Sequence, residues 1–206
     1  MRLDVPWRVL PEQFGSWQSV YTRWRRWCER GIWKAILERL GTLESRQLRL
    51  LDATHDKVHK DSSTGGHHQT QAIGRSKGGV NTKIKALVDG LAWPVGLELA
   101  AGNCAYVSAA ETVALPVGKR LVGDKGCDSD PFRQWIVAQG STSCNPPCKN
   151  RVRKVAWHRG WSRHRHHVEN FCQRIKRWRR LGTRYEKLAK RFLAFVQLVG
   201  ILDWLR

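Results

Sequence analysis

The sequence is poor in acidic residues and contains no long hydrophobic run. Seventeen Asp and Glu residues stand against 37 Lys and Arg residues in a chain of 206, which gives a formal net charge of +20. Solubility alone does not require such an excess, so it predicts a polyanionic partner, most simply nucleic acid. No apolar stretch reaches the roughly 18 residues of a membrane span, and the first ten residues lack the apolar core of a signal peptide. We therefore expect a cytoplasmic protein with no membrane partner.

Cysteine forms no compact framework. The six cysteines are scattered along the chain, which is typical of reduced thiols in a cytosolic protein. Cys144 and Cys148 lie close together, with two prolines between them. Two readings remain open for this pair: small buried hydrophobic residues, or half of a zinc site completed by His158 or His164.

The first 44 residues predict a small helical region. Tryptophan and other apolar residues recur at spacings of three and four over 17–28, which is typical of an amphipathic helix. Gly31 interrupts the pattern, and a second helix is expected over 32–40. The pair resembles a helix-turn-helix unit that contacts DNA, although an ordinary helical hairpin packed on the main domain has the same pattern. The arginines expected to contact DNA from the first helix are Arg23, Arg25 and Arg26.

Residues 45–206 predict a single α/β domain. Strands are expected over 48–54 and 120–124, and two apolar runs, 82–88 and 91–99, flank Asp89-Gly90 as in a hairpin. The glycine-rich segment 61–79 predicts a loop whose Arg75 and Lys77 reach a phosphate backbone. Helices are expected over 106–115, over 131–138 with Asp130 as its cap, and through most of the last fifty residues. The basic stretch of that final region includes Arg177, Arg179 and Arg180.

Two acidic residues stand at the ends of predicted strands, and a third lies on a predicted helix. This order of elements is compatible with a ribonuclease-H-like mixed sheet, in which carboxylates from two neighbouring strands and a later helix converge. Clustered carboxylates repel one another unless divalent cations neutralise them, and oxygen-only ligands suit Mg²⁺ or Mn²⁺. The three candidates are Asp52, Asp124 and Glu169, and the nearby Asp56, Asp89 and Asp128 remain open as alternatives.

Arg165, Glu169 and Lys176 are separated by four and seven residues, so a helix would project all three to one side. A carboxylate flanked by two cations suits a site where metal ions and phosphates meet. A solvated Arg–Glu pair on an exposed helix face is the alternative interpretation, and it would contribute only a few tenths of a kcal/mol.

Four segments together carry a more specific signal. The chain contains, in order, PWRVLPEQFGSWQSVYTRWRRWCERGIW, QAIGRSKGGVNTKIKALVDGLAWPV, GDKGCDSDPFR and HHVENFCQRIKRWRRLGTRYEKLAKRF. These segments resemble bacterial insertion-sequence DDE transposases of the insertion-sequence-five group, within the wider four/five family, over nearly the whole chain. The resemblance implies a helical DNA-binding region over 1–44 and a ribonuclease-H-like DDE catalytic domain over 45–206.

The resemblance also implies residue roles. It places the two aspartates of the family on Asp52 and Asp124 and its glutamate on Glu169, as ligands of Mg²⁺ or Mn²⁺. Arg165 and Lys176 match the arginine and lysine of the Tyr-Arg-Glu-Lys pattern of the family, whereas Ser162 stands at the tyrosine position.

The function implied is transposition: metal-dependent cleavage at the ends of an insertion element and transfer of those ends into target DNA. Double-stranded DNA is the expected partner, the protein is expected to act as a homodimer on DNA, and nucleoid association follows. Two alternatives stay open. One is a ribonuclease-H-like nuclease without strand transfer, and the other is a truncated or inactive remnant that only binds DNA.

Overall fold

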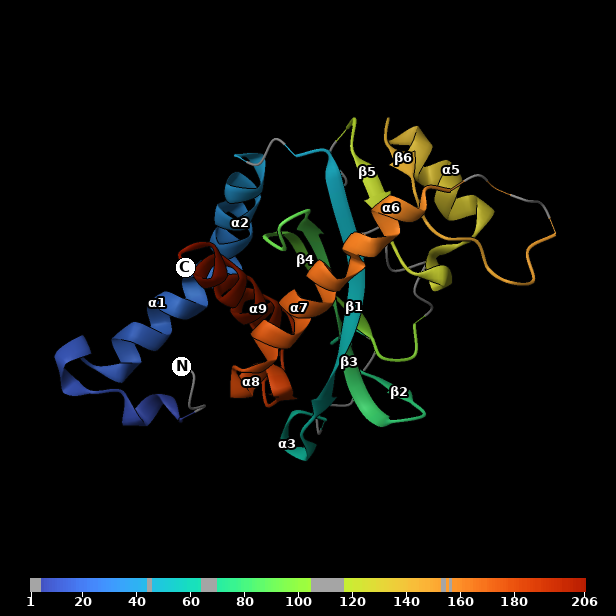
Figure 1. Ribbon diagram of the computed structural model, residues 1–206. Helices are drawn as coiled ribbons and strands as arrows, with labels where there is room; N and C mark the ends of the chain where they lie inside the picture. The colour runs from blue at the N-terminus through green and yellow to red at the C-terminus, as the bar shows by residue number, and fades with distance from the viewer. Residues whose placement is uncertain (1–4, 44–45, 64–69, 105–116, 153–154, 156) are drawn as a thin grey trace.

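A curled mixed sheet with helices on both faces forms the centre of the molecule (Figure 1). The computed structural model describes residues 5–43, 46–63, 70–104, 117–152, 155 and 157–206. Across the sheet the main strands follow the order β4-β3-β1-β5-β6, with the short β2 beside β3 and β7 beside β1. The strands are β1 (Leu48–Val58), β2 (Gly74–Ser76), β3 (Gly79–Asp89), β4 (Pro94–Ala101), β5 (Arg120–Val122), β6 (Thr142–Ser143) and β7 (Thr183–Arg184).

The sheet combines an antiparallel half with a parallel half. Strand β3 runs antiparallel to both β1 and β4, while β5 runs parallel to β1 and β6 runs parallel to β5. The predicted hairpin is confirmed as β3–β4. Its turn depends on Asp89, whose Oδ1 accepts hydrogen bonds from the backbone N–H of Leu91 at 2.9 Å and of Trp93 at 2.7 Å. The strand expected over 48–54 extends further, to Val58.

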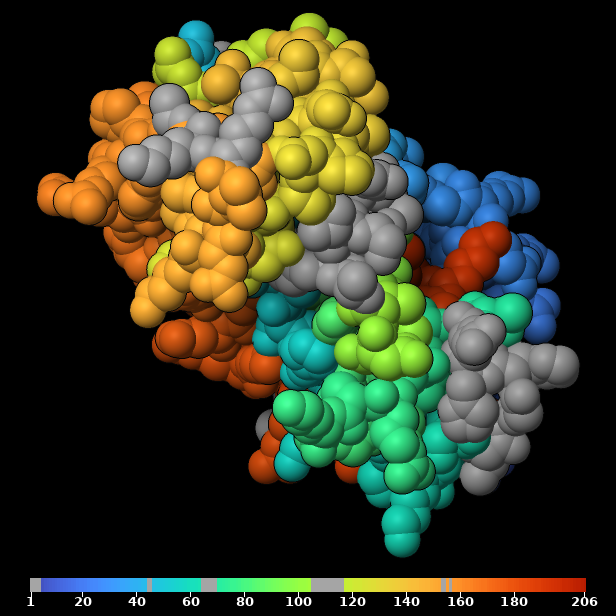
Figure 2. Space-filling view, turned by 90° about the vertical axis from the view of Figure 1, so that its right-hand side faces the viewer, coloured from blue at the N-terminus to red at the C-terminus, as the bar shows by residue number. Residues whose placement is uncertain are grey.

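Helix α7 crosses one face of the sheet in front of β1, and α5 lies beside the β5–β6 edge (Figure 1). Figure 2 shows the molecule from that edge, with the segment around α5 coloured yellow and the β2–β3 end coloured green. The α-helices are α1 (Trp17–Glu29), α2 (Ile32–Thr42), α3 (Lys60–Ser63), α5 (Asp130–Ala138), α6 (Arg159–Ser162), α7 (His166–Lys176), α8 (Arg179–Gly182) and α9 (Ala189–Trp204). The 3₁₀ turns are η1 (Trp7–Val9), η2 (Glu12–Phe14), η3 (Lys125–Cys127) and η4 (Arg163–Arg165).

Alternating side chains of β1 belong to two different cores, because successive residues of a strand point to opposite faces. Leu50 packs into the larger core, which is closed by the buried side of α7 and by α9. Leu51 packs into a smaller core with Phe132 and Ile136 of α5. Each face of the sheet is therefore covered, and the even-numbered residues of β1, which include Asp52, lie on the face toward α7.

The N-terminal helices share the larger core. Trp24 and Cys28 of α1 and Leu37 of α2 are buried in the same cluster as Phe195 and other residues of α9. Gly31 joins the two helices with a φ of +67°, a left-handed conformation that glycine adopts without a Cβ clash. Both predicted helices are confirmed, and α1 keeps its arginines on the side facing away from this core.

Several local predictions need correction. The cap of α5 is Ser129, whose Oγ accepts from the N–H of Phe132 at 3.3 Å, and Asp130 is the first residue of the helix. The segment expected to be a loop over 61–79 contains the end of α3 and all of β2 within its described residues. The helix expected over 106–115 falls outside the described residues.

Candidate active site

Asp52 lies within β1, and Asp124 lies two residues beyond the end of the neighbouring parallel strand β5. The register pairs Leu48 with Arg120 and Leu50 with Val122. Continued by two residues, the same offset puts Asp124 opposite Asp52, and the negative charge of Asp124 is near enough to act on Asp52. Parallel pairing therefore brings together two acids that are far apart in the sequence.

Glu169 reaches the same place from α7. The guanidinium of Arg165 connects the two elements, since its Nη2 lies 3.0 Å from Oε1 of Glu169 and 3.5 Å from Oδ2 of Asp52. Helix α7 is fixed over β1 by a buried stripe, so this approach is held by packing. The stripe consists of Val168, Phe171, Cys172 and Ile175.

The pKa of Asp52 is raised above its ordinary value. Burial is the main cause, since it disfavours the charged carboxylate, and the negative charges of Asp124 and Glu169 add to it. A hydrogen bond from the N–H of Ala53 and the positive charge of Arg165 act in the opposite direction. Asp124 and Glu169 are thus both near enough to Asp52 to disfavour its negative charge.

The loop that carries Asp124 is held at both ends by a side chain that sequence reasoning missed. Asn145 is fully buried, and its Oδ1 accepts from the N–H of Gly123 at 2.6 Å while its Nδ2 donates to the carbonyl of Cys127 at 3.2 Å. Between these points Oδ1 of Asp124 accepts from the N–H of Cys127 at 3.1 Å and caps η3. No motif marks Asn145 in the sequence, since its role depends on pairing between β5 and the chain after β6.

Two of the alternative acids have structural roles elsewhere. Asp89 forms the β3–β4 turn described above. Asp128 holds two arginines, with its Oδ1 2.8 Å from Nε of Arg133 and 2.8 Å from Nη1 of Arg151. Burial raises the pKa of Asp128, but its hydrogen bond from the N–H of Cys148 and these two cations outweigh that effect and lower it.

The third alternative, Asp56, is fully buried on β1, four residues beyond Asp52. Neither of its carboxylate oxygens has a hydrogen-bond partner among the described residues. Burial raises its pKa to about 7, against the opposing charges of Lys176 and Arg184. It lies on the same face of β1 as Asp52.

Lys176 and Ser162 occupy the two remaining positions of the predicted pattern. Nζ of Lys176 donates to the carbonyl of His55 at 3.1 Å, so the lysine lies beside β1 rather than against Glu169. The hydroxyl of Ser162 is buried without a hydrogen-bond partner in the described part of the chain. Arg165 and Glu169 form the predicted pair, and Arg165 adds the contact with Asp52 that helix spacing alone could not predict.

No group of three or more His, Cys, Asp and Glu side chains within the described ranges lies at metal-binding distances. The donor chemistry nevertheless fits a hard divalent cation, because the three nearby acids offer only oxygen ligands. The raised pKa of Asp52 is what a cation would relieve. Cys148 donates its thiol to the carbonyl of Lys125, and Cys144 is buried.

The residues expected to contact DNA are spread over three surfaces. Arg23, Arg25 and Arg26 are exposed on α1, Arg75 and Lys77 are exposed at the β2–β3 turn, and Arg177 and Arg179 are exposed after α7. Arg180 is partly covered: its Nη1 lies 3.8 Å from Glu186, and its Nη2 donates to the carbonyl of Val5. None of the helices described is long and apolar enough to cross a bilayer.

Comparison with known families agrees with this geometry. Residues 44–204 match the family model described as "Transposase DDE domain", and residues 1–37 match the one described as "Putative transposase of IS4/5 family". The chain is also similar to the "Putative transposase for insertion sequence element IS6501" of Brucella ovis. That relative is 28% identical over 133 residues, which are 62% of this chain and 100% of that protein. A DDE transposase domain has a ribonuclease-H-like fold, so the predicted fold class is confirmed.

Proposed function

The chain belongs to the transposase DDE domain family, and from this premise we propose that it cuts DNA at the ends of an insertion element and joins those ends to target DNA. One observation supports the proposal: Asp124, just beyond β5, is near enough to Asp52 on the adjacent parallel strand β1 to raise its pKa, and Arg165 connects Asp52 to Glu169 on α7. Members of this family use divalent metal ions in general, and we propose Mg²⁺, with Mn²⁺ as a substitute.

Asp52, Asp124 and Glu169 would hold the cations. A pair of divalent ions in such a site lowers the pKa of a water or 3′-hydroxyl nucleophile and stabilises charge on the leaving oxygen. Asp52 and Glu169 must both be ionised to act as ligands. The fixed packing of α7 on β1 keeps the two carboxylates near each other before DNA arrives, which reduces the reorganisation that binding requires.

Arg165 forms ion pairs with both Asp52 and Glu169, and we propose that it also binds DNA phosphate. In the structure its guanidinium neutralises part of the charge of Asp52 and Glu169. With its planar fork of N–H donors, the guanidinium would also be able to hold a phosphate oxygen of bound DNA. Lys176, seven residues beyond Glu169 at the end of α7, would hold a neighbouring phosphate as a point charge.

The DNA partner is proposed from the charge distribution. The exposed arginines of α1, the cations of the β2–β3 turn and the basic stretch after α7 would contact phosphates, and such contacts position a protein without reading the sequence. An insertion element has two ends, so we also propose that two copies of the chain act together on DNA, in association with the nucleoid.

The test uses purified full-length protein and a duplex that carries the DNA flanking its reading frame. Nicking and end-joining are scored with Mg²⁺, with Mn²⁺ and with a chelator, for the natural chain, Asp124→Asn and Glu169→Ala. Metal-dependent cutting and joining, both abolished by either substitution without loss of binding, are expected. Cutting without joining would favour a nuclease, and binding without cutting would favour an inactive DNA-binding remnant. Asp61→Asn, which changes an exposed aspartate, is the matched control.

A further inference from the structure

Two hollows adjoin each other beyond the C-terminal end of α7. The first has a volume of about 720 Å³, and its walls include Lys176, Arg179, Arg180 and Tyr185. The second has a volume of about 270 Å³, and its walls include Trp7 and Phe192 together with Arg180 and Tyr185. Arg180 and Tyr185 line both hollows, so the two are immediate neighbours, and we call them together the groove.

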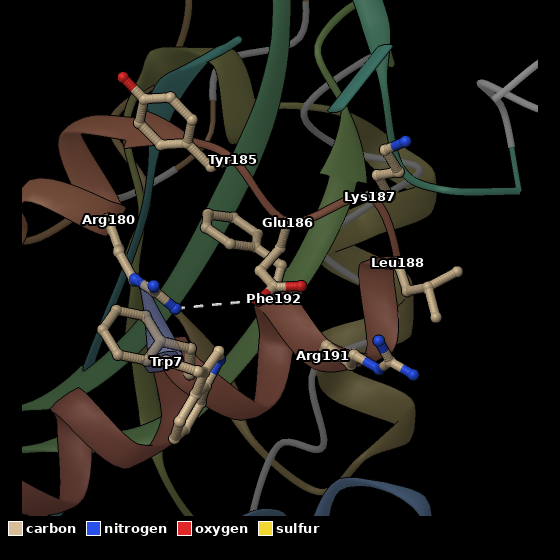
Figure 3. Close-up of a pocket in the computed structure, with 9 residues that line it drawn as sticks. Trp7, Arg180, Tyr185, Glu186, Lys187, Leu188, Arg191 and Phe192 are labelled. Atoms are coloured by element: carbon tan, nitrogen blue, oxygen red, sulfur yellow. Dashed lines mark ion pairs between the residues drawn. The ribbon is translucent and has the colours of Figure 1, made fainter. Parts of the chain in front are cut away.

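The halves of this groove differ in chemistry. The lining of the first half contains three cations and no acid, so it suits phosphate groups. The second half also has three cations, Arg180, Lys187 and Arg191, but it adds aromatic walls and an acid, Glu186, whose Oε1 lies 3.8 Å from Nη1 of Arg180 (Figure 3). A carboxylate in that position disfavours a phosphate, whereas aromatic rings favour a flat and uncharged group.

The size of the second half also suits a flat ring. Its volume of about 270 Å³ exceeds the roughly 150 Å³ of an engineered cavity that holds benzene. A base within a duplex is stacked and paired, so it would have to leave its partner to enter a pocket of this kind. An unpaired strand meets no such cost.

The groove also starts near the candidate carboxylates. Lys176 and Glu169 lie on the same helix, seven residues apart, which corresponds to about 10 Å along the axis at 1.5 Å per residue. A strand passing Glu169 along α7 would therefore meet Lys176 next, then Arg179, and then the aromatic half.

We propose that this groove binds an unpaired segment of DNA, with phosphates on Lys176 and Arg179 and a base in the pocket lined by Trp7, Tyr185 and Phe192. Interleaved cations and aromatic side chains are the ordinary means of holding single strands without regard to sequence. Only the identity of the strand, as one adjoining the cut, rests on the proposed function. The groove also brings a residue of the N-terminal segment, Trp7, into contact with the DNA.

The test measures binding of a fluorescein-labelled single strand of about 12 nucleotides and of a duplex with the same sequence, both in chelator. Tyr185 is 46% exposed, so Tyr185→Ala leaves the core intact. We expect it to weaken binding of the single strand about fivefold or more, as the loss of one stacked base does, and to leave duplex binding unchanged. Phe14→Ala, at an exposed aromatic residue outside the groove, is the matched control and is expected to change neither.

Two further experiments measure the salt dependence of single-strand binding and the place where the strand cross-links to the protein. Arg179→Gln is expected to lower the slope of log affinity against log salt by about 0.7 for the single strand, the value of one lost phosphate contact. Lys190→Gln, at an exposed lysine that lines neither hollow, is expected not to change it. A strand carrying 5-iododeoxyuridine is expected to photocross-link to Trp7 or Tyr185.

Equal affinities for the natural chain and Tyr185→Ala, equal weakening of single strand and duplex, or cross-links confined to other segments would each overturn the proposal. None of these readouts needs metal or cleavage, so a failure here is distinguishable from a failure of the proposed enzymatic function.

Discussion

Nη2 of Arg165 lies 3.5 Å from Oδ2 of Asp52, although 113 residues separate the two in the sequence. The same nitrogen lies 3.0 Å from Glu169, so one guanidinium joins a strand acid to a helix acid. In the described protein Arg165 supplies positive charge where we propose that metal ions bind. The arginine therefore supplies part of the charge compensation that the Asp52 carboxylate needs.

The pH dependence of metal-dependent cutting tests this relationship. Arg165 lowers the pKa of Asp52 against the raising effects of burial, Asp124 and Glu169. Arg165→Gln removes that lowering effect, so the pKa of Asp52 rises further and the acidic limb of the pH–rate profile should move to higher pH. The measurement is the rate of cutting against pH at a fixed Mg²⁺ concentration. Arg163→Gln, at an exposed arginine on the same turn, is the control, and a shift to lower pH would contradict the assignment.

Asn145 provides a test of how the Asp124 loop is held. Asn145→Ala leaves the N–H of Gly123 and the carbonyl of Cys127 without the partners that they have now. Each buried group left unpaired costs about 1–3 kcal/mol, so the free energy of unfolding in urea should fall by about 2 kcal/mol or more. Cutting should fall while duplex affinity stays unchanged. Asn170→Ala, on the exposed side of α7, should change neither the free energy of unfolding nor cutting. If Asn145→Ala changed both as little as Asn170→Ala does, the role proposed for Asn145 would be refuted.

Asp56 predicts a pH dependence of stability. Its folded pKa of about 7 lies above the ordinary value of 3.8, so between these values the folded state binds more protons than the unfolded state. Stability should then fall as pH rises through this window, by at most about 1.4 kcal/mol per pH unit.

Asp56→Asn removes the titrating group, so thermal unfolding should lose this part of its pH dependence. The measurement is the difference between the stability profiles of the natural chain and the variant from pH 4 to pH 7. Asp61→Asn, at an exposed carboxylate, should leave the slope as it is. Parallel profiles for the natural chain and Asp56→Asn would argue against a protonated Asp56.

Arg184 is a buried arginine that holds separate segments together. Its guanidinium donates to the carbonyl of Gln71 at 2.9 Å, to Oγ1 of Thr82 at 2.7 Å, and to the carbonyls of Glu186 and Lys187. Arg184→Met leaves these acceptors without their donor, so unfolding should become easier by about 3 kcal/mol or more. Arg177→Met, at an exposed arginine, should change stability by less than about 0.5 kcal/mol. Comparable urea midpoints for the two variants would contradict the contribution assigned to Arg184.

The local spacing of apolar residues predicted individual helices and the hairpin better than it predicted which distant segments pair. Amphipathic spacing predicted α1, α2 and α7, and apolar runs around Asp89-Gly90 predicted the β3–β4 hairpin. Acids at predicted strand ends marked Asp52 and Asp124 as candidates, but only the parallel pairing of β1 with β5 brings the two segments together.

The features that sequence could not predict depend on distant partners. Asn145 and Arg184 have no local signature, because Asn145 binds groups about twenty residues away and Arg184 binds Gln71 and Thr82, each more than a hundred residues away. The cap of α5 was predicted wrongly because Ser129 and Asp130 are both good capping residues. In the structure Ser129 has the extended backbone of a cap, and Asp130 already belongs to the helix.

The most direct measurement locates the metal without relying on catalysis. Fe²⁺ substituted at a Mg²⁺ site, with ascorbate and peroxide, generates hydroxyl radicals that cut the polypeptide near the bound ion. We expect fragments with new ends near residues 52 and 124, suppressed by excess Mg²⁺ and lost in Asp124→Asn but not in Asp61→Asn. Fragmentation confined to the histidines around residue 166, or unaffected by Asp124→Asn, would contradict a metal site built on Asp52, Asp124 and Glu169.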